Sequence, residues 1–530
     1  MGTLNVTAFL GFTALVAYLS YLWTRGTDEH NSDGYFLGGR SLTAPVIAGS
    51  LLLTNLSTEQ IVGLTGQAYA EGILVMAWET LAAITIVITA LVLLPRYLRS
   101  GVSTIPAFLE ERYDAQTKTA TSLLFLSGYV IVLLPIVLYS GALALSTMFD
   151  VPGVLGVGDT VALWITVWAI GIVGSVYAIF GGLKAVAVSD TINAIGLFLG
   201  GFLVPVFGLL AIGGGSVLDG LSVLWTENPG KFDAIGGPDS SVPFATIFTG
   251  MMLVQLFYWG TNQAIIQRAL GARDLKEGQK GLIIAAFLKI FGPVIVVLPG
   301  IIAYHLFSGG LEVADQAYPR LVSEVLPFPL RGFFAAVLFG AILSSFNSAL
   351  NSSVTLFGVD IYRQYIRPEA SDVQTVQAGK NFGWVLAIAA MTIAPFIAKA
   401  PQGLFGYLQE VNGCYSIPIL TIILVGIFTR RVPPMAAKIG LASGVVLYII
   451  SQFILKSRIG AENYPHYLHV MAILFALNIC IMLIIGKMRP MEPAYTPHDS
   501  HAVNMTPWGL AKPMGALIVA IVVSTYFIFT

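Results

Sequence analysis

The sequence repeats one feature from end to end: apolar runs of roughly 20 residues, separated by short polar segments. A helix of about 20 residues crosses the ~30 Å hydrocarbon core of a bilayer. By this rule we predict an all-α polytopic membrane protein with about fourteen transmembrane helices, at 4–23, 43–69, 72–98, 120–149, 158–180, 184–213, 241–270, 277–306, 330–362, 373–399, 402–429, 433–455, 465–487 and 511–529.

Composition excludes several other classes of protein. Charged residues make up only 10% of the chain and hydrophobic residues 56%, which excludes a disordered chain. The net charge of -1 and the absence of a basic run argue against a nucleic-acid partner. The polar segments 213–240 and 488–510 are too short for a catalytic domain, and the histidines show no metal-binding spacing beyond His466 and His469. We therefore expect no enzyme activity, and no obligate protein partner is evident.

Lysine and arginine are distributed unevenly between the two sets of predicted loops. One set holds 20 of the 27 basic residues and the other holds six, while Lys289 lies inside a span. Cytoplasmic loops carry the excess of Lys and Arg. The bias predicts that the richer set is cytoplasmic and that both termini lie outside.

Two predicted spans are interrupted by polar residues. Positions 54–60 interrupt the span 43–69, and positions 258–263 interrupt the span 241–270, five spans later. Irregular backbone in a membrane is tolerated where it lines a cavity, and paired interruptions in inverted halves are typical of a transporter's binding site. The alternative is two ordinary helices with polar faces. Gln409 and Glu410, with Pro418 further on, predict a third irregular span.

Two charges lie deep in predicted spans. Glu79 would bind sugar hydroxyls, a proton or a cation, or would be a structural carboxylate neutralised by a neighbouring helix. Lys289 is the one cation in mid-membrane by sequence. Pairing the two would ease the desolvation of both.

A polar stripe follows one face of the span 330–362, at Ser344, Ser345, Asn347, Ser348, Asn351 and Ser352. Its oxygens suit a hard cation such as sodium, although small polar residues also allow close helix packing. Asp190, at the start of the span 184–213, is either a helix-start carboxylate or a group that attracts a departing cation.

Amides and aromatic residues accompany these groups. Gln60, Gln255 and Gln409 both donate and accept hydrogen bonds, which suits a ligand rich in hydroxyls. Tyr258, Trp259 and Phe405 would stack on the apolar face of a sugar ring, or simply pack.

Five motifs resemble the sodium:solute symporter family, most closely its bacterial sodium/galactose branch. They are NLSTEQ (55–60), FGGLKAV (180–186), YWGTNQAIIQR (258–268), AAFLK (285–289) and LSSFNSALNS (343–352). The resemblance implies a bacterial inner-membrane protein with a LeuT-like core of two inverted five-helix repeats. It divides the chain into an extra helix and cytoplasmic loop (1–42), a first repeat (43–213), an external loop (214–240), a second repeat (241–429) and three further helices (430–530).

The resemblance also implies site residues. The implied sugar contacts are Asn55, Gln60, Glu79, Gln255, Lys289 and Gln409, with Tyr258 as the inner gate, Trp259 beside it, and Leu64 and Phe405 as an outer lid. The implied sodium ligands are the carbonyls of Leu53, Leu56 and Ala341 and the hydroxyls of Ser344 and Ser345. Asp190 matches a residue on the sodium exit route. An alternative hypothesis is that Asn347, which departs from the galactose branch, binds a second sodium with Asp190, Ser345 and Ser348.

We therefore expect sodium-coupled import of a hexose such as galactose or glucose, with Na⁺ and the lipid bilayer as the other partners. Gln255 and Ala82 stand where the galactose branch has asparagine and serine, so the sugar itself stays open. The alternatives are a symporter of the same fold for a polyol, a sialic acid or an amino acid, and a membrane sensor that does not transport.

Overall fold

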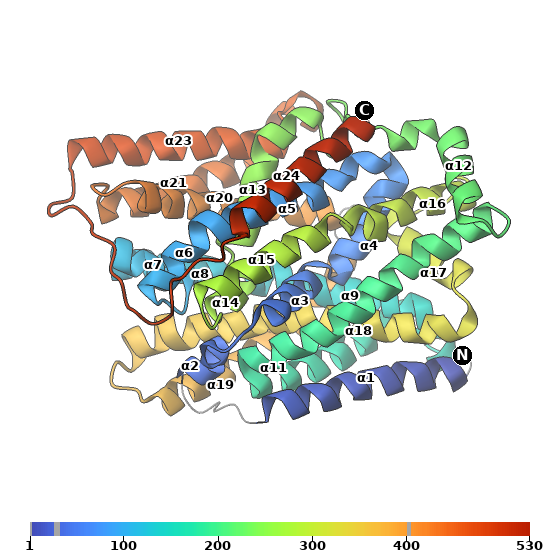
Figure 1. The fold of residues 1–530 in the computed structure, drawn as a ribbon, viewed down its shortest axis with the longest axis horizontal. Helices are drawn as coiled ribbons and strands as arrows, with labels where there is room; N and C mark the ends of the chain where they lie inside the picture. The colour runs from blue at the N-terminus through green and yellow to red at the C-terminus, as the bar shows by residue number, and fades with distance from the viewer. Residues whose placement is uncertain (1–2, 26–31, 400–403, 530) are drawn as a thin grey trace.

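The structure, a computed structural model, describes residues 3–25, 32–399 and 404–529. Its long helices run roughly along one axis as a bundle, and the described residues form no named strand (Figure 1). The start of the predicted span 402–429 and part of the loop in 1–42 lie outside the described residues.

The helices of the first half of the chain are α1 (Thr3–Thr24), α2 (Ser32–Leu37), α3 (Ala44–Asn55), α4 (Thr58–Glu71), α5 (Ala77–Ile88), α6 (Leu94–Ser100), α7 (Ile105–Arg112), α8 (Ala115–Gly128), α9 (Leu134–Phe149), α10 (Val151–Leu155), α11 (Asp159–Ile212) and α12 (Val217–Glu227). Those of the second half are α13 (Gly250–Gly260), α14 (Gln263–Leu270), α15 (Leu275–Lys289), α16 (Leu298–Leu306), α17 (Ala317–Val325), α18 (Phe328–Thr355), α19 (Asp372–Ile393), α20 (Leu404–Phe428), α21 (Pro434–Ile449), α22 (Lys456–Ile459), α23 (Tyr467–Met488) and α24 (Ala511–Ile528).

Eleven helical segments of the described chain are long and apolar enough to cross a membrane, and a twelfth is the bent segment formed by α15 and α16. The predicted spans 43–69 and 241–270 are not among them because each is split into two short helices. The all-α membrane fold is therefore confirmed, whereas the count of fourteen stays a prediction. Exposed apolar side chains on these helices, such as Leu199, Val385 and Ile484, have the character of lipid-facing residues.

Several spans change their winding without ending. Wide π-type turns join α5 to α6 (η3, Thr89–Leu93), join α8 to α9 (η4, Tyr129–Leu133) and continue α18 (η9, Leu356–Ile366). Within α11 the chain turns at Gly182, whose φ of 56° favours glycine, and Tyr177 donates to the carbonyl of Ala185 across the turn at 2.9 Å. This turn separates the predicted spans 158–180 and 184–213.

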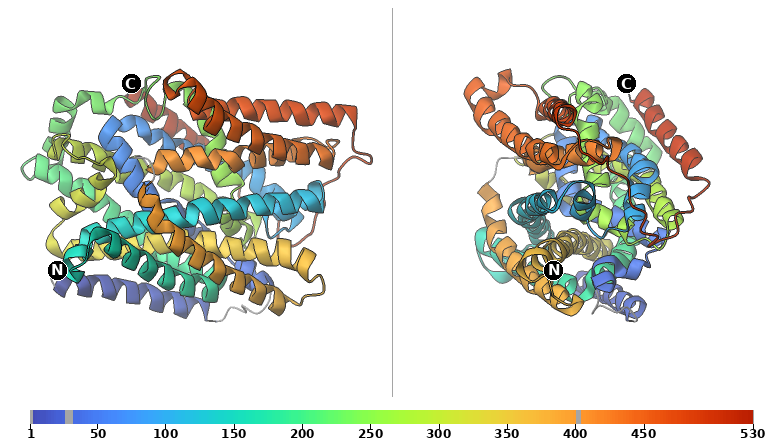
Figure 2. Two further views of the ribbon diagram at one scale, coloured as in Figure 1. Left: turned by 180° about the vertical axis from the view of Figure 1, so that it is seen from behind. Right: turned by 90° about the vertical axis from the view of Figure 1, so that its left-hand side faces the viewer.

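Helices distant in sequence form the centre of the bundle. The half-helices α3 and α4 lie among α11, α15, α16 and α18, and α1 covers α11 and α18 from outside (Figures 1 and 2). At one end of the bundle lie α2, α7 and the starts of α14 and α15, and at the other lies α12. The predicted cytoplasmic loops occupy the first of these ends, which we call the basic end.

Candidate functional site

The first interruption is a break of the helix at Leu56 and Ser57. The α3 helix ends at Asn55, Leu56 leaves helical geometry (φ -76°, ψ 55°), Ser57 is extended, and α4 starts at Thr58. The carbonyls of a last helical turn have no partner within the helix. The Leu56 amide donates to the carbonyl of Leu52 at 2.8 Å, so the carbonyls of residues 53–55 are left for other partners. The sequence prediction of a broken span is confirmed here.

The second interruption separates α13 from α14 at Thr261 and Asn262. The Asn262 side chain caps α14 by accepting from the amide of Ala264 (3.0 Å), and it also accepts from the hydroxyl of Tyr129 (2.8 Å). The break is thereby fixed to η4. Tyr258, the predicted inner gate, lies on the last turn of α13, directly before this break.

The third predicted interruption is wrong. The α20 helix is continuous from Leu404 to Phe428 and contains Pro418 in its interior. Gln409 and Glu410 therefore project from a regular helix. Tyr448 of α21 donates to the Glu410 carbonyl at 2.7 Å, and Lys456 pairs with its carboxylate at 2.6 Å.

Four of the predicted sugar contacts lie together and bond one another. Lys289 forms a buried ion pair with Glu79 and also donates to the side-chain oxygen of Asn55. The Gln60 amide donates to the other carboxylate oxygen of Glu79 at 2.6 Å. All four side chains are buried, Glu79 completely. The deep carboxylate and the deep ammonium thus neutralise each other, and two amides complete the cluster.

A central cavity of about 50 Å³ adjoins this cluster. Its lining includes the predicted residues Gln60, Tyr258, Gln409 and Phe405. Ligand pockets usually hold about 300–1,000 Å³, so a sugar would require this site to widen.

Several polar residues in the cavity wall were given no role in the sequence analysis, among them Glu59, Asn262 and Asn412. Glu59 is buried, and one of its carboxylate oxygens has no hydrogen-bond partner among the described residues. A signal for Glu59 was available, because it belongs to the interrupting run 54–60, next to Gln60.

Gln255, Trp259 and Leu64 are buried close by but do not line the central cavity. The Gln255 amide donates to the Trp78 carbonyl at 2.7 Å and accepts from the indole of Trp259 at 3.2 Å. In this conformation Gln255 holds α13 against α5, and Trp259 of the same helix fixes the orientation of the Gln255 amide. Phe405, by contrast, lines the cavity and packs edge-to-face on Trp78, with ring centroids 5.2 Å apart.

The predicted sodium ligands lie where α3 meets α18. The Ser345 hydroxyl donates to the carbonyl of Thr54 at 3.0 Å, and the Thr54 hydroxyl lies 3.3 Å from that of Ser344 and 3.2 Å from that of Ser348. The other three predicted ligands, Leu53, Leu56 and Ala341, are all buried on these two segments. Neutral hydroxyl and carbonyl oxygens of this kind fit a hard monovalent cation.

An ion pair that sequence reasoning missed lies beside these hydroxyls. Arg268 of α14 is 3.8 Å from the carboxylate of Asp190, and it donates to Ser50 (3.0 Å) and to Ser348. Ser50 in turn donates to Asp190 at 2.7 Å. By sequence Arg268 lies near the end of the predicted span 241–270, and in the structure its side chain is 1% exposed because α14 is folded into the bundle.

Asn347 does not face the central cavity, which Ser345 and Ser348 of the stripe line. It lines a separate cavity of about 120 Å³ between α1, α11 and α18, together with Tyr177, Asn193 and Ser344. Its side-chain oxygen is buried and has no partner among the described residues.

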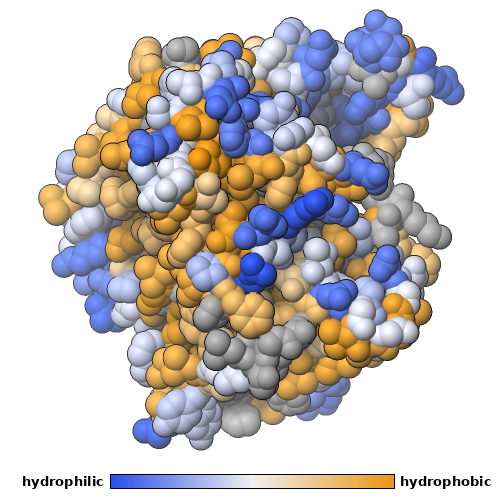
Figure 3. Space-filling view, turned by 90° about the vertical axis from the view of Figure 1, so that its right-hand side faces the viewer, coloured by the Kyte–Doolittle hydropathy of each residue, from blue (hydrophilic) through white to orange (hydrophobic). Residues whose placement is uncertain are grey.

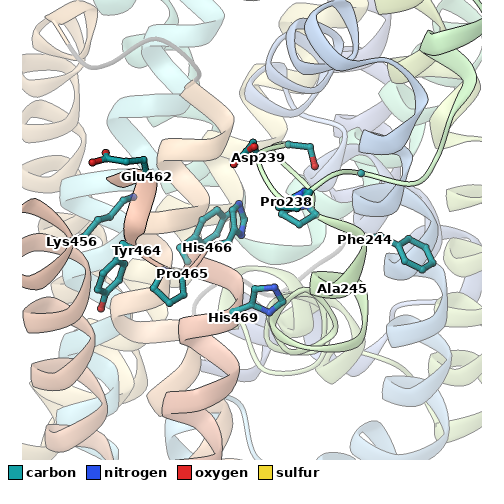
Figure 4. Close-up of a pocket in the computed structure, with 14 residues that line it drawn as sticks. Pro238, Asp239, Phe244, Ala245, Lys456, Glu462, Tyr464, Pro465, His466 and His469 are labelled. Carbon is teal, nitrogen blue, oxygen red and sulfur yellow. The ribbon is translucent and has the colours of Figure 1, made fainter. Parts of the chain in front are cut away.

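A larger cavity of about 670 Å³ opens at the end of the bundle opposite the basic end, between the segment before α13 and the segment before α23 (Figure 4). Figure 3 shows hydrophilic side chains at this end in separate patches among hydrophobic ones. His466, which caps α23, and His469, 3.0 Å from the hydroxyl of Thr249, both line the cavity. No predicted site residue lines it, and the described residues contain no cluster of three His, Cys, Asp or Glu side chains fit for a metal.

Comparison with known proteins identifies the family. The model of the sodium:solute symporter family matches residues 35–444, which include both helix breaks, the Glu79–Lys289 pair and the serine stripe. The chain belongs to the sodium:solute symporter family. Sodium is therefore its coupling ion, and the symporter is a multi-pass membrane protein.

Two relatives and one solved structure extend this result. The symporter is 48% identical to an uncharacterized symporter, YidK, of Escherichia coli over 97% of this chain and 88% of the relative. It is 35% identical to the sodium/glucose cotransporter of Vibrio parahaemolyticus over 85% of both chains. A Na⁺-coupled sialic acid symporter, solved in a substrate-bound outward-open state, has a TM-score of 0.76 and 18% identity, covering 93% of this chain and 99% of that one. The fold is thus that of the LeuT-like symporters.

Proposed function

We propose that this symporter imports a neutral hexose together with sodium. The observation that carries the proposal is the buried Glu79–Lys289 pair with Gln60 and Asn55. It supplies several donors and acceptors without net charge, as a polyhydroxylated neutral ligand requires. The 35% identity to a sodium/glucose cotransporter supports the same substrate class.

Each side chain has a role in the proposed site. Asn55, Gln60, Glu79, Lys289 and Gln409 bind sugar hydroxyls, Glu59 offers its unpaired carboxylate oxygen, and Gln255 contributes after rearrangement of its bonds to α5. Tyr258, with Trp259 beside it, closes the site towards the basic end. Leu64 and Phe405 form the lid on the other side.

Sodium binds in this proposal between α3 and α18, through the carbonyls of Leu53, Leu56 and Ala341 and the hydroxyls of Ser344 and Ser345. By joining the two helices it completes the sugar site, so each ligand raises the affinity for the other. Asp190 and Ser348 serve sodium exit rather than a second sodium, because Arg268 already supplies a cation to both. Asn347 faces another cavity, which supports the same assignment.

We further propose that the inverted repeats are 43–213 and 241–429 and that the basic end faces the cytoplasm of a bacterium, with both termini outside. The biased distribution of Lys and Arg supports this orientation. The membrane potential then contributes about 2.3 kcal/mol per sodium charge per 100 mV.

A polyol is the second candidate substrate, because it offers the same hydroxyls without a ring. A sialic acid or an amino acid fits less well, since Glu79 neutralises the ammonium that would bind a carboxylate.

Uptake into proteoliposomes tests the proposal. We expect a sodium gradient to drive accumulation of radiolabelled galactose or glucose, and Gln60→Ala to abolish uptake while the melting temperature is retained. Accumulation of myo-inositol or sialic acid alone would reassign the substrate. Binding of hexose without accumulation would indicate a sensor.

A further inference from the structure

A buried carboxylate outside the proposed site connects the sodium helix to the inner half-helix. Asp360 lies on η9, the wide-turn continuation of α18, and its side chain is completely buried. Its oxygens accept from the hydroxyls of Thr104 (3.1 Å) and Ser122 (3.0 Å), and they lie 3.5 Å from the ammonium of Lys118. A charge buried this deeply in a membrane protein is rarely kept without a function.

The partners of Asp360 belong to one small unit at the basic end. Thr104 caps α7 by accepting from the amide of Ala107 (3.0 Å), while Lys118 and Ser122 lie on consecutive turns of α8. Lys118 also pairs with Glu110 of α7 at 2.8 Å. The α7–α8 unit is therefore bonded to η9 by Asp360 through three polar partners. Further along η9, Gln364 donates to Glu110 (3.1 Å) and the Tyr365 hydroxyl lies 2.6 Å from that of Thr119, but Asp360 is the completely buried member of these links.

The same unit is bonded to α14. The amide of Ile105, the first residue of α7, donates to the side-chain oxygen of Gln263 at 2.8 Å. Gln263 is the first residue of α14, directly after the break that follows Tyr258. A continuous path of buried hydrogen bonds thus runs from α18 through Asp360, Thr104 and Ile105 to α14.

A second, direct set of bonds fixes the register of the same two helices. Gln267 of α14 accepts from Ser352 (2.8 Å) and donates to Thr355 (3.0 Å), both on α18. Ser352, the last residue of the serine stripe, therefore contacts α14 directly. Asp360 adds an indirect link between α18 and α14 through α7.

We propose that Asp360 is a positioning residue that transmits the state of the sodium helix α18, through α7, to the inner half-helix α14. The inference rests on the proposed sodium site, because Ser344 and Ser345 lie on α18, but it does not depend on which solute is carried. When sodium aligns α18 with α3, the chain of bonds holds α14 closed over the cavity. When sodium leaves, α18 shifts and α14 is free to open.

Labelling of a cysteine at the start of α14 tests the proposal. The full chain carries Ala264→Cys, with Cys414→Ser and Cys480→Ser to remove the native thiols, and is reconstituted so that the basic end is accessible to an impermeant maleimide. Ala264 lines the central cavity and is buried, so its labelling reports opening of α14. In this parent we expect sodium alone to slow labelling by about fivefold or more, which lies within the usual range of coupling between two sites of a protein.

Asp360→Asn should label faster than the parent, and sodium should no longer slow it. The matched control is Asp372→Asn, which breaks an exposed ion pair with Arg363 (3.0 Å) at the same end of the molecule and should keep the parent's sodium effect. Thr104→Val removes the hydroxyl through which α7 bonds Asp360, and it should likewise abolish the sodium effect on labelling. This variant replaces Asp360→Asn as the test if Asp360→Asn does not fold. A full sodium effect in a folded Asp360→Asn or, failing that, in Thr104→Val would overturn the proposal.

The sugar assignment is tested separately. If the unsubstituted chain takes up no hexose, the proposed substrate is wrong. The sodium effect on labelling would still measure the coupling between α18 and α14.

Discussion

Arg268 and Asp190 form a fully buried ion pair, 3.8 Å apart, beside the hydroxyls of the proposed sodium site. The two residues come from α14 and α11, which are separated by about eighty positions in sequence. The guanidinium shares Ser50 with the carboxylate and also donates to Ser348, so the charge of Asp190 is already balanced inside the protein.

Removing either member of this pair should destabilise the fold. Arg268→Gln leaves a buried carboxylate and Asp190→Asn leaves a buried guanidinium, each expected to cost about 3–5 kcal/mol. The double variant should lose less stability than the sum of the two, by about 1–3 kcal/mol. Thermal unfolding in detergent measures all three, and strictly additive losses would contradict a direct pairing.

Ser345→Ala should weaken the response to sodium with little effect on stability. The substitution removes a hydroxyl that bonds the Thr54 carbonyl and that we assign to sodium. A hydrogen bond of about 1 kcal/mol corresponds to a several-fold higher sodium concentration at half-maximal uptake. Ser353→Ala is the matched control, since Ser353 lies further along the same helix and its hydroxyl donates to the Ala349 carbonyl at 2.8 Å. Equal sodium curves for both variants would remove Ser345 from the site.

Gly292→Ala should impair sugar uptake although position 292 carries no polar side chain. A Cβ atom there would overlap the carboxylate of Glu79, at 2.9 Å from Cδ and closer still to Oε2. The carboxylate would have to leave Gln60 and Lys289, so we expect about tenfold weaker sugar affinity and a loss of 1–3 kcal/mol in stability. Gly237→Ala, where nothing lies within 4 Å, should leave uptake unchanged. Normal affinity in Gly292→Ala would show that Glu79 moves freely.

Acid should destabilise the end of the bundle that carries His466. Burial, with the nearby charges of His469 and Lys456, lowers the pKa of His466 from 6.5 to about 4. Between these values the unfolded chain binds more protons than the folded one, so stability falls as pH drops from about 6.5 towards 4. His466→Asn, which keeps a cap for α23, should flatten the melting temperature over this range. His501→Asn, at an exposed position, should not.

Those parts of the site that depend on local sequence were predictable. The polar run 54–60 identified the break at Leu56, and the isolation of Glu79 and Lys289 among apolar residues identified their pairing. Partners set by tertiary packing were not. The Arg268–Asp190 pair was missed because only tertiary packing brings α14 and α11, about eighty positions apart in sequence, together.

Pro418 and Gln255 illustrate the same limit on sequence reasoning. Pro418 suggested a broken helix, yet α20 accommodates it without interruption. Gln255 was expected to face the sugar, but its amide is used by Trp78 and Trp259, a choice that only the packing of α5 against α13 determines.

The bonds among Asn55, Gln60, Glu79 and Lys289 also bear on the return step of the transport cycle. A carrier that has released its cargo must reorient across the membrane with an empty site, and unsatisfied buried charge would obstruct that step. Here the ammonium and the carboxylate satisfy each other. The Glu79–Lys289 pair can therefore cross the reorientation of the unloaded protein without itself moving net charge.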